Sequence, residues 1–238
     1  MDGPAESPQE QEESVSARSK RRAWTEIGVA YALILAVEWT PRPWQRLLWL
    51  VAAAGVVFIL SRSFDGWAAL GLRAANLARS LWIVGVALAV AGIAIAISAW
   101  KHTFLLPDGP LAFAGTYIAY AVWTGVQQFL LQSFFLLRLQ RVIPGGWQPA
   151  LAAALLFAAA HLPNPVLVPI TLLWGFASCL LFLRYRNLYP LMMAHAILGI
   201  TVAITVPAPV VHNMRVGLGY MTYRSHIHAP HMHRLSQP

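Results

Sequence analysis

The feature that most constrains this chain is a series of apolar runs, several of which reach the length of a membrane span. About 20 consecutive apolar residues in a helix cross the roughly 30 Å hydrocarbon core of a bilayer. Hydrophobic residues make up 58% of the 238 residues and charged residues only 11%, too apolar a balance for an ordinary soluble domain. Helices and closed barrels are the structures that satisfy their backbone hydrogen bonds in lipid, and runs of this length indicate helices. The sequence therefore predicts an all-α fold, a polytopic membrane helix bundle.

Turn signals and charged clusters divide the hydrophobic part of the chain into about seven transmembrane segments. Their approximate bounds are 23–40, 44–60, 81–100, 113–140, 147–161, 166–182 and 188–206. Together they form one domain, a membrane bundle over residues 23–206. A polar tail of residues 1–22 precedes the bundle, and a polar, histidine-rich tail of residues 207–238 follows it.

The first tail indicates how the chain enters the membrane. Residues 1–22 are rich in Ser, Glu and Gln and cannot bury a core, so we expect them to be disordered. They contain no apolar stretch that would make a cleavable signal peptide. Basic residues at 20–22 stand directly before the first span, and this charge bias predicts a cytoplasmic N-terminus.

The second tail and the net charge carry less information about function. We expect residues 207–238 to be a solvated tail, and its histidines are His212, His226, His228, His231 and His233. The formal charge of +8 comes from basic residues that cluster at the ends of the spans. Such residues orient helices in a membrane, so we expect no nucleic-acid binding.

The segment 113–140 carries more amides than a lipid-facing helix tolerates. Thr124, Gln128 and Gln132 are four residues apart and lie on one helical face, and Gln127 is next to Gln128. An unpaired amide in hydrocarbon costs several kcal/mol, so this face must point toward protein or toward a wet cavity. One interpretation is hydrogen bonding between helices, worth about 0.6 kcal/mol per pair. The other is a functional polar cavity.

Two histidines at membrane depth, His161 and His195, favour the cavity. Ionisable residues inside a membrane are candidates for function. Both histidines occur in the same half of the chain as the amides, and no Asp or Glu follows Asp108. We therefore expect one shared polar pocket that contains no carboxylate of its own half.

These residues resemble the motifs of a known family. Phe157 and His161 fit FxxxH, His195 lies on a later helix, and an amphipathic helix with a doubled polar residue precedes both. The pattern is similar to that of the CPBP family, intramembrane proteases that include CAAX prenyl endopeptidases and bacteriocin-processing or self-immunity proteins. In that family the order is EExxxR, FxxxH, then HxxxN or HxxxD. The resemblance covers about residues 70–205 and implies a bacterial plasma-membrane protein.

The resemblance also implies roles for the residues, with departures. Gln127 and Gln128 stand in place of the Glu pair, Gln132 in place of Arg, and Gly199 in place of Asn or Asp. By the resemblance, Gln127 and His161 hold a water and His195 polarises the scissile carbonyl, whereas Gly199 cannot donate from a side chain. The predicted catalytic residues are thus Gln127, Gln128, His161 and His195. The predicted supporting residues are Thr124, Gln132, Phe157, Asn164 and Gly199.

The amides decide which chemistry is open to such a site. A Gln amide positions a water but takes up no proton near neutral pH. A base is then supplied by His161, or by Glu26 or Glu38 reaching in from the first span. Two His with neutral amides are a poor ligand set for zinc, so we expect no metal and no cofactor.

Two functions remain open at this point. The first is an intramembrane endopeptidase of the CPBP type with an altered, His-dependent activation of water. The second is a catalytically silent relative that binds a membrane peptide or partner, in an immunity or chaperone-like role. The partners expected in either case are the lipid bilayer and a membrane-associated peptide or lipidated protein. A transporter is less favoured, because the sequence has no inverted repeat or pair of broken helices.

Overall fold

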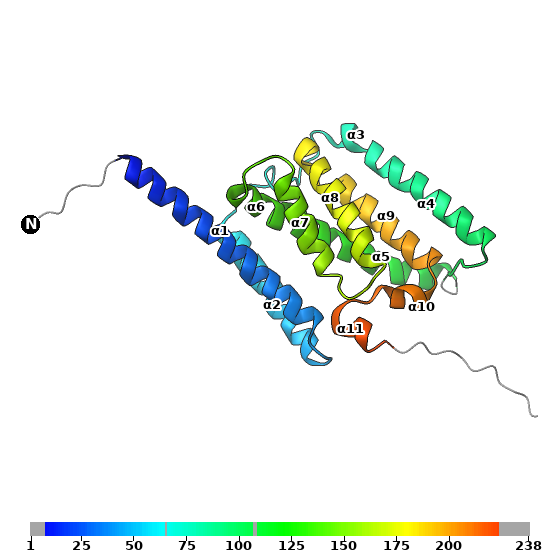
Figure 1. Cartoon of the computed structure of the whole chain (residues 1–238). Helices are drawn as coiled ribbons and strands as arrows, with labels where there is room; N and C mark the ends of the chain where they lie inside the picture. Colours follow the sequence, from blue (N-terminus) through cyan, green and yellow to red (C-terminus); the bar gives the residue numbers. More distant parts are fainter. Residues whose placement is uncertain (1–7, 65, 107–108, 224–238) are drawn as a thin grey trace, which may run out of the picture.

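The computed structural model describes residues 8–64, 66–106 and 109–223, and within these ranges all regular structure is helical (Figure 1). Asp108 and the four histidines from His226 to His233 lie outside the described residues. The helices in chain order are α1 Pro8–Glu38, α2 Trp44–Arg62, α3 Leu77–Ser80, α4 Trp82–Trp100, α5 Pro110–Gln128, the π-helix η1 Phe129–Leu136, α6 Leu137–Val142, α7 Gln148–Ala159, α8 Leu167–Tyr185, α9 Tyr189–Thr205, α10 Ala208–Val211, the 3₁₀-helix η2 His212–Met214 and α11 Gly217–Met221.

The predicted fold class, an all-α membrane helix bundle, is confirmed. Each predicted hydrophobic segment is helical over most of its length. Among the described residues, three helical stretches are both long and apolar enough to cross a membrane: Trp44–Arg62, Leu77–Trp100 and Leu167–Tyr185. Gln148–Ala159 and Tyr189–Thr205 are shorter apolar helices. The chain is an integral membrane protein.

The helices pack in a few close pairs. Helix α9 packs against α4 and α5, α7 packs against α8, and α1 packs against α2 and α6. An ion pair joins α1 to α6, because the Glu26 carboxylate accepts hydrogen bonds from Arg138 Nε and Arg22 Nε, both at 2.7 Å. The side chain of Arg138 is only 4% exposed, so this contact ties the first helix to the end of the amide-bearing helix inside the protein.

The amide-bearing helix is continuous from α5 through η1 to α6, but its middle is a π-helix. In a π-helix the hydrogen bonds run from residue i to i+5, and such stretches often occur at functional sites. The whole stretch Leu131–Leu136 is buried, including Gln132 and Ser133. The wider turn changes which side chains share a face after Gln128, and the apolar pattern did not predict it.

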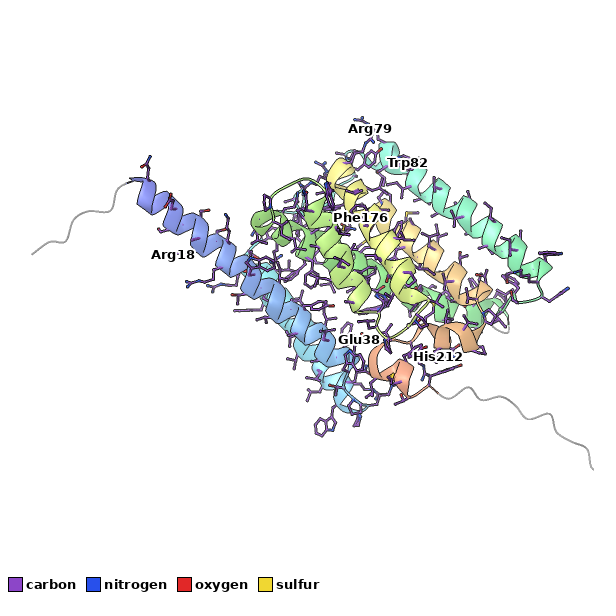
Figure 2. All side chains as sticks on the ribbon, in the orientation of Figure 1. Arg18, Glu38, Arg79, Trp82, Phe176 and His212 are labelled. Atoms are coloured by element: carbon purple, nitrogen blue, oxygen red, sulfur yellow. The ribbon has the colours of Figure 1, made fainter. Side chains whose placement is uncertain are left out.

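Residues 8–22 differ from the expectation of disorder, since they form the first half of α1. This half extends beyond the rest of the bundle and carries Arg18 (Figures 1 and 2). Glu, Gln, Ala, Lys and Arg are strong helix formers, and the apolar half of α1 supplies the nucleus from which the helix continues. The polar composition therefore excluded a core but did not exclude a helix.

The described part of the C-terminal tail also differs from the expectation of a solvated segment. Residues 208–221 form α10, η2 and α11, which lie at one end of the bundle near the α1–α2 turn (Figure 1). The Asn164 amide donates to the carbonyls of Val211 and Arg215 at 2.9 and 3.1 Å. The His212 ring stacks on Tyr220 with centroids 4.1 Å apart. Backbone carbonyls paired with a buried amide hold this segment, and composition does not reveal such contacts.

Candidate active site

A cavity of about 890 Å³ lies between the α1–α2 hairpin and helices α5, α7, α8 and α9. Most of its lining side chains are apolar, as expected for a site inside a membrane protein. Gln127, His161 and His195 all line this cavity, and so do Phe157 and Gly199. The structure thus brings polar groups from α5, from the turn after α7 and from α9 to one cavity.

Gln128 lies behind His195 in a chain of buried hydrogen bonds. Its Nε2 is 3.1 Å from Nδ1 of His195, and its Oε1 accepts a hydrogen bond from Nε2 of Gln132 at 3.3 Å. The same Nε2 of Gln132 donates to Oγ of Ser178 at 2.9 Å. Ser178 in turn donates to the carbonyl of Gly175 at 3.1 Å. Gln128, Gln132 and Ser178 are fully buried, so this amide relay fixes His195 from the protein side.

His161 is held by its own helix end. Its Nδ1 is 2.7 Å from the carbonyl oxygen of Phe157, four residues earlier. The Phe157 ring also packs edge-on against both imidazoles, with centroids 4.8 Å from His161 and 5.9 Å from His195. The two histidines therefore share one aromatic neighbour and flank it within the same cavity.

The two hydrogen bonds assign opposite tautomers to the two imidazoles. The Phe157 carbonyl only accepts, so Nδ1 of His161 carries the proton and its Nε2 has a free lone pair. The Gln128 Nε2 only donates, so Nδ1 of His195 accepts and its Nε2 carries the proton. One imidazole thus offers a base and the other offers a donor. The arrangement suits a reaction that removes a proton from one oxygen while stabilising negative charge on another.

Residues 109–201 match the family model described as Rce1-like, type II CAAX prenyl endopeptidase Rce1-like. The chain therefore carries a domain similar to the CPBP family over these residues. The predicted family resemblance is therefore confirmed, and the matched region runs from the start of α5 into α9, including the amides and both histidines. Neither the comparison with curated proteins nor the comparison with solved structures found a match.

Three predicted supporting residues, Thr124, Gln132 and Asn164, lie outside the cavity lining. The Thr124 hydroxyl is buried and donates to the carbonyl of Ala121 within its own helix. Gln132 belongs to the relay. Asn164 lies just before α8, where its Oδ1 accepts from the backbone N–H groups of Val166 and Leu167 at 3.1 and 3.0 Å. Gln132 and Asn164 thus join separate elements and Thr124 bonds within its own helix, and none of the three lines the cavity.

The two carboxylates considered as bases for the CPBP-type site lie in different places. Glu26 is occupied by Arg22 and Arg138 and does not line the cavity. Glu38 lines the cavity and is labelled in Figure 2 at the end of α1, which contacts α11. Within the part of the chain that the structure describes, no three His, Cys, Asp or Glu side chains gather to hold a metal ion.

Two side chains of this site were not among the predicted site residues, although the sequence already placed Tyr120 on the stripe that extends the amide-bearing face. Ser178 ends the amide relay, but a single Ser in an apolar helix gives no signal without a known partner. Tyr120 lines the cavity, and a side chain at position 199 would meet its hydroxyl. Tyr120 lies eight residues before Gln128, so its place on the amide-bearing face was the available signal.

Proposed function

We propose that this chain is an intramembrane endopeptidase of the CPBP, CAAX-protease type, which hydrolyses a peptide bond of a membrane-associated protein. His161 acts as the base that activates water, His195 donates to the scissile carbonyl, and Gln127 holds the water. The opposite tautomers of two imidazoles on one cavity are the observation that carries this proposal.

The reaction follows from these two protonation states. Nε2 of His161 takes a proton from water as the water oxygen bonds to the carbonyl carbon. The carbonyl π electrons move to oxygen, and the resulting oxyanion accepts the Nε2–H of His195. When the tetrahedral intermediate collapses, the C–N bond breaks and the imidazolium of His161 returns its proton to the leaving amine. A positioned base contributes about 10²–10⁴-fold and a donor to the oxyanion about 10²–10³-fold.

The lining of the cavity supports an apolar, membrane-associated substrate. A volume of about 890 Å³ is within the range of pockets that bind small apolar ligands, and most of the lining side chains are apolar, including aliphatic ones from α1, α2 and α8. These walls favour a hydrophobic peptide or a prenyl chain, and in this proposal His161 and His195 position the scissile carbonyl. The substrate class we propose is therefore a lipidated or hydrophobic membrane peptide.

A silent binding protein is the second candidate, and the amides favour it. Gln127 takes up no proton, and Glu26 is engaged in ion pairs. A neutral cavity of this kind binds a membrane peptide without cutting it, provided that His161 stays neutral throughout. The two candidates use the same cavity and differ in whether His161 accepts a proton.

The test uses the full chain in detergent and a farnesylated peptide ending in a CAAX sequence, with a fluorophore and quencher on either side of the scissile bond. We expect cleavage by the wild type and a loss of about 10²–10⁴-fold in His161→Ala. Gln127→Ala should lower the rate, and Gln127→Glu should raise it by adding a second base. The exposed His102 is the matched control, and His102→Ala should cleave at the wild-type rate.

Each outcome separates the candidates. Binding of the peptide without cleavage, with equal affinity in His161→Asn, would establish the silent binding protein. If the protein neither binds nor cleaves this probe, the proposed substrate class is refuted. A cleavage rate that falls when divalent metals are chelated would refute the metal-free chemistry written above.

We further propose that the protein lies in the plasma membrane with its N-terminus in the cytoplasm, because the basic residues 20–22 precede the first apolar span. The native Cys179 is fully buried and gives a silent background for labelling. A Ser19→Cys variant should resist a membrane-impermeant maleimide in intact cells and react after permeabilisation. Labelling in intact cells would reverse the orientation.

A further inference from the structure

The phenol of Tyr120 occupies the space beside α9 where a side chain at position 199 would stand. A Cβ built on Gly199 would overlap the Tyr120 hydroxyl and crowd the adjacent ring carbons, which lie 2.8 and 2.9 Å from it. The glycine is helical and has an ordinary backbone conformation, so the requirement for glycine here is one of space. Gly199 and Tyr120 therefore form one matched pair between α9 and α5.

The Tyr120 hydroxyl is available to a ligand. Tyr120 lines the same cavity as Gln127, His161 and His195. Within residues 8–64, 66–106 and 109–223, no protein group pairs with this hydroxyl, and it is not among the side-chain atoms enclosed without a partner. A hydroxyl sealed in protein without a partner costs about 1–3 kcal/mol, which an opening toward the cavity avoids. The hydroxyl thus faces the space that water or substrate fills.

The hydroxyl also lies close to the donor of the proposed reaction. Positions 195 and 199 are one helical turn apart, which separates their Cβ atoms by about 5–6 Å. Since the hydroxyl lies directly against the position that a Cβ of residue 199 would take, it lies about one helical turn from His195 on the same face of α9. The buried relay fixes His195 from behind, and Gly199 fixes the phenol beside it.

We propose that the Tyr120 hydroxyl is a second hydrogen-bond donor to the substrate carbonyl, beside Nε2–H of His195, and that Gly199 is glycine in order to admit it. This inference rests on the proposed function. In the tetrahedral intermediate the carbonyl oxygen carries a full negative charge, so two converging donors stabilise it more than they stabilise the substrate. The phenol keeps its proton throughout and donates without transferring it.

The first test is Tyr120→Phe, which removes one oxygen atom and keeps the ring against Gly199. We expect kcat for the farnesylated CAAX peptide to fall about 10²-fold with KM and unfolding little changed, since the donor acts in the intermediate. Tyr117→Phe is the matched control. Tyr117 lies on the same helix, packs on Phe113 with centroids 4.6 Å apart and does not line the cavity. Loss of its hydroxyl should therefore leave kcat unchanged.

The second test moves the hydrogen-bond donor from position 120 to position 199. Gly199→Asn alone should lose activity, because the new side chain displaces the phenol. Tyr120→Ala alone should also lose activity, because it leaves an empty space. The double variant Tyr120→Ala/Gly199→Asn should recover at least about tenfold over Tyr120→Ala, since the Asn amide now supplies a donor from the vacated place.

The outcomes distinguish this inference from the proposed function. If the wild type cleaves, His161→Ala does not, and Tyr120→Phe cleaves at the wild-type rate, the role of Tyr120 is refuted and the protease remains. If the wild type does not cleave any CAAX probe, the proposed function fails and the second donor fails with it. A drop confined to KM in Tyr120→Phe would also refute a role in stabilising the intermediate.

Discussion

Replacing Gln128 with methionine removes the amide that holds His195 while nearly conserving side-chain volume and helix propensity. The change deletes two buried hydrogen bonds, one to Nδ1 of His195 at 3.1 Å and one from Gln132 at 3.3 Å. Gln132 keeps Ser178 as a partner, so the group left unpaired is Nδ1 of His195. The His195 imidazole then loses the contact that fixes its tautomer.

The size of the effect follows from these contacts. A buried polar atom left without a partner costs about 1–3 kcal/mol in soluble proteins. Hydrogen bonds between membrane helices are worth about 0.6 kcal/mol on average and about 1.7 at most, because the unfolded chain in the membrane also finds partners. We therefore expect Gln128→Met to lower the free energy of unfolding by about 1–2 kcal/mol. If the same energy keeps the His195 imidazole in its catalytic orientation, kcat should fall about 5–30-fold.

The assay is unfolding of the purified protein by sodium dodecyl sulfate in mixed micelles, followed by tryptophan fluorescence, together with ¹⁵N spectra of the imidazoles. The adjacent Gln127→Met is the matched control, since Gln127 lines the cavity and no protein group among the described residues pairs with its amide. The control should change the unfolding free energy by less than about 0.5 kcal/mol. Equal stability losses in the two variants, or a ¹⁵N spectrum of His195 unchanged by Gln128→Met, would refute the relay.

Two further variants test the parts of the fold that frame the site. Asn164→Ala deletes two hydrogen bonds at the start of α8 and two to the C-terminal segment, so it should lower the free energy of unfolding by about 2–4 kcal/mol. It should also release the C-terminal segment, measured as faster tryptic cleavage at Arg215, and unchanged protection of that bond would contradict the anchoring role. Glu26→Gln leaves Arg138 without its anion in a nearly buried position and should lower the free energy of unfolding by about 1.5–3 kcal/mol, whereas the exposed control Glu13→Gln should change nothing measurable in the same titration.

The helical segments followed from the sequence because length and hydrophobicity alone determine what crosses a bilayer. The predicted bounds of the third segment, 81–100, nearly coincide with those of α4. The histidines and amides were also readable, since a polar side chain at membrane depth must face protein or water. A motif then identified the family, and the match over residues 109–201 agrees with it.

The tertiary structure decided how these side chains meet. Lipid and helix surfaces are equally apolar, so the hydrophobic pattern does not determine how far each membrane helix is rotated about its axis. The π-helix after Gln128 and the packing of α9 on α5 set that rotation, and only then does one amide reach His195 while its neighbour faces the cavity. The pairing of Tyr120 with Gly199 depends on the same rotation, as does the relay to Ser178. The sequence by itself determined which polar groups enter the membrane, and the packing of helices determined which of them hold one another and which remain open to a substrate.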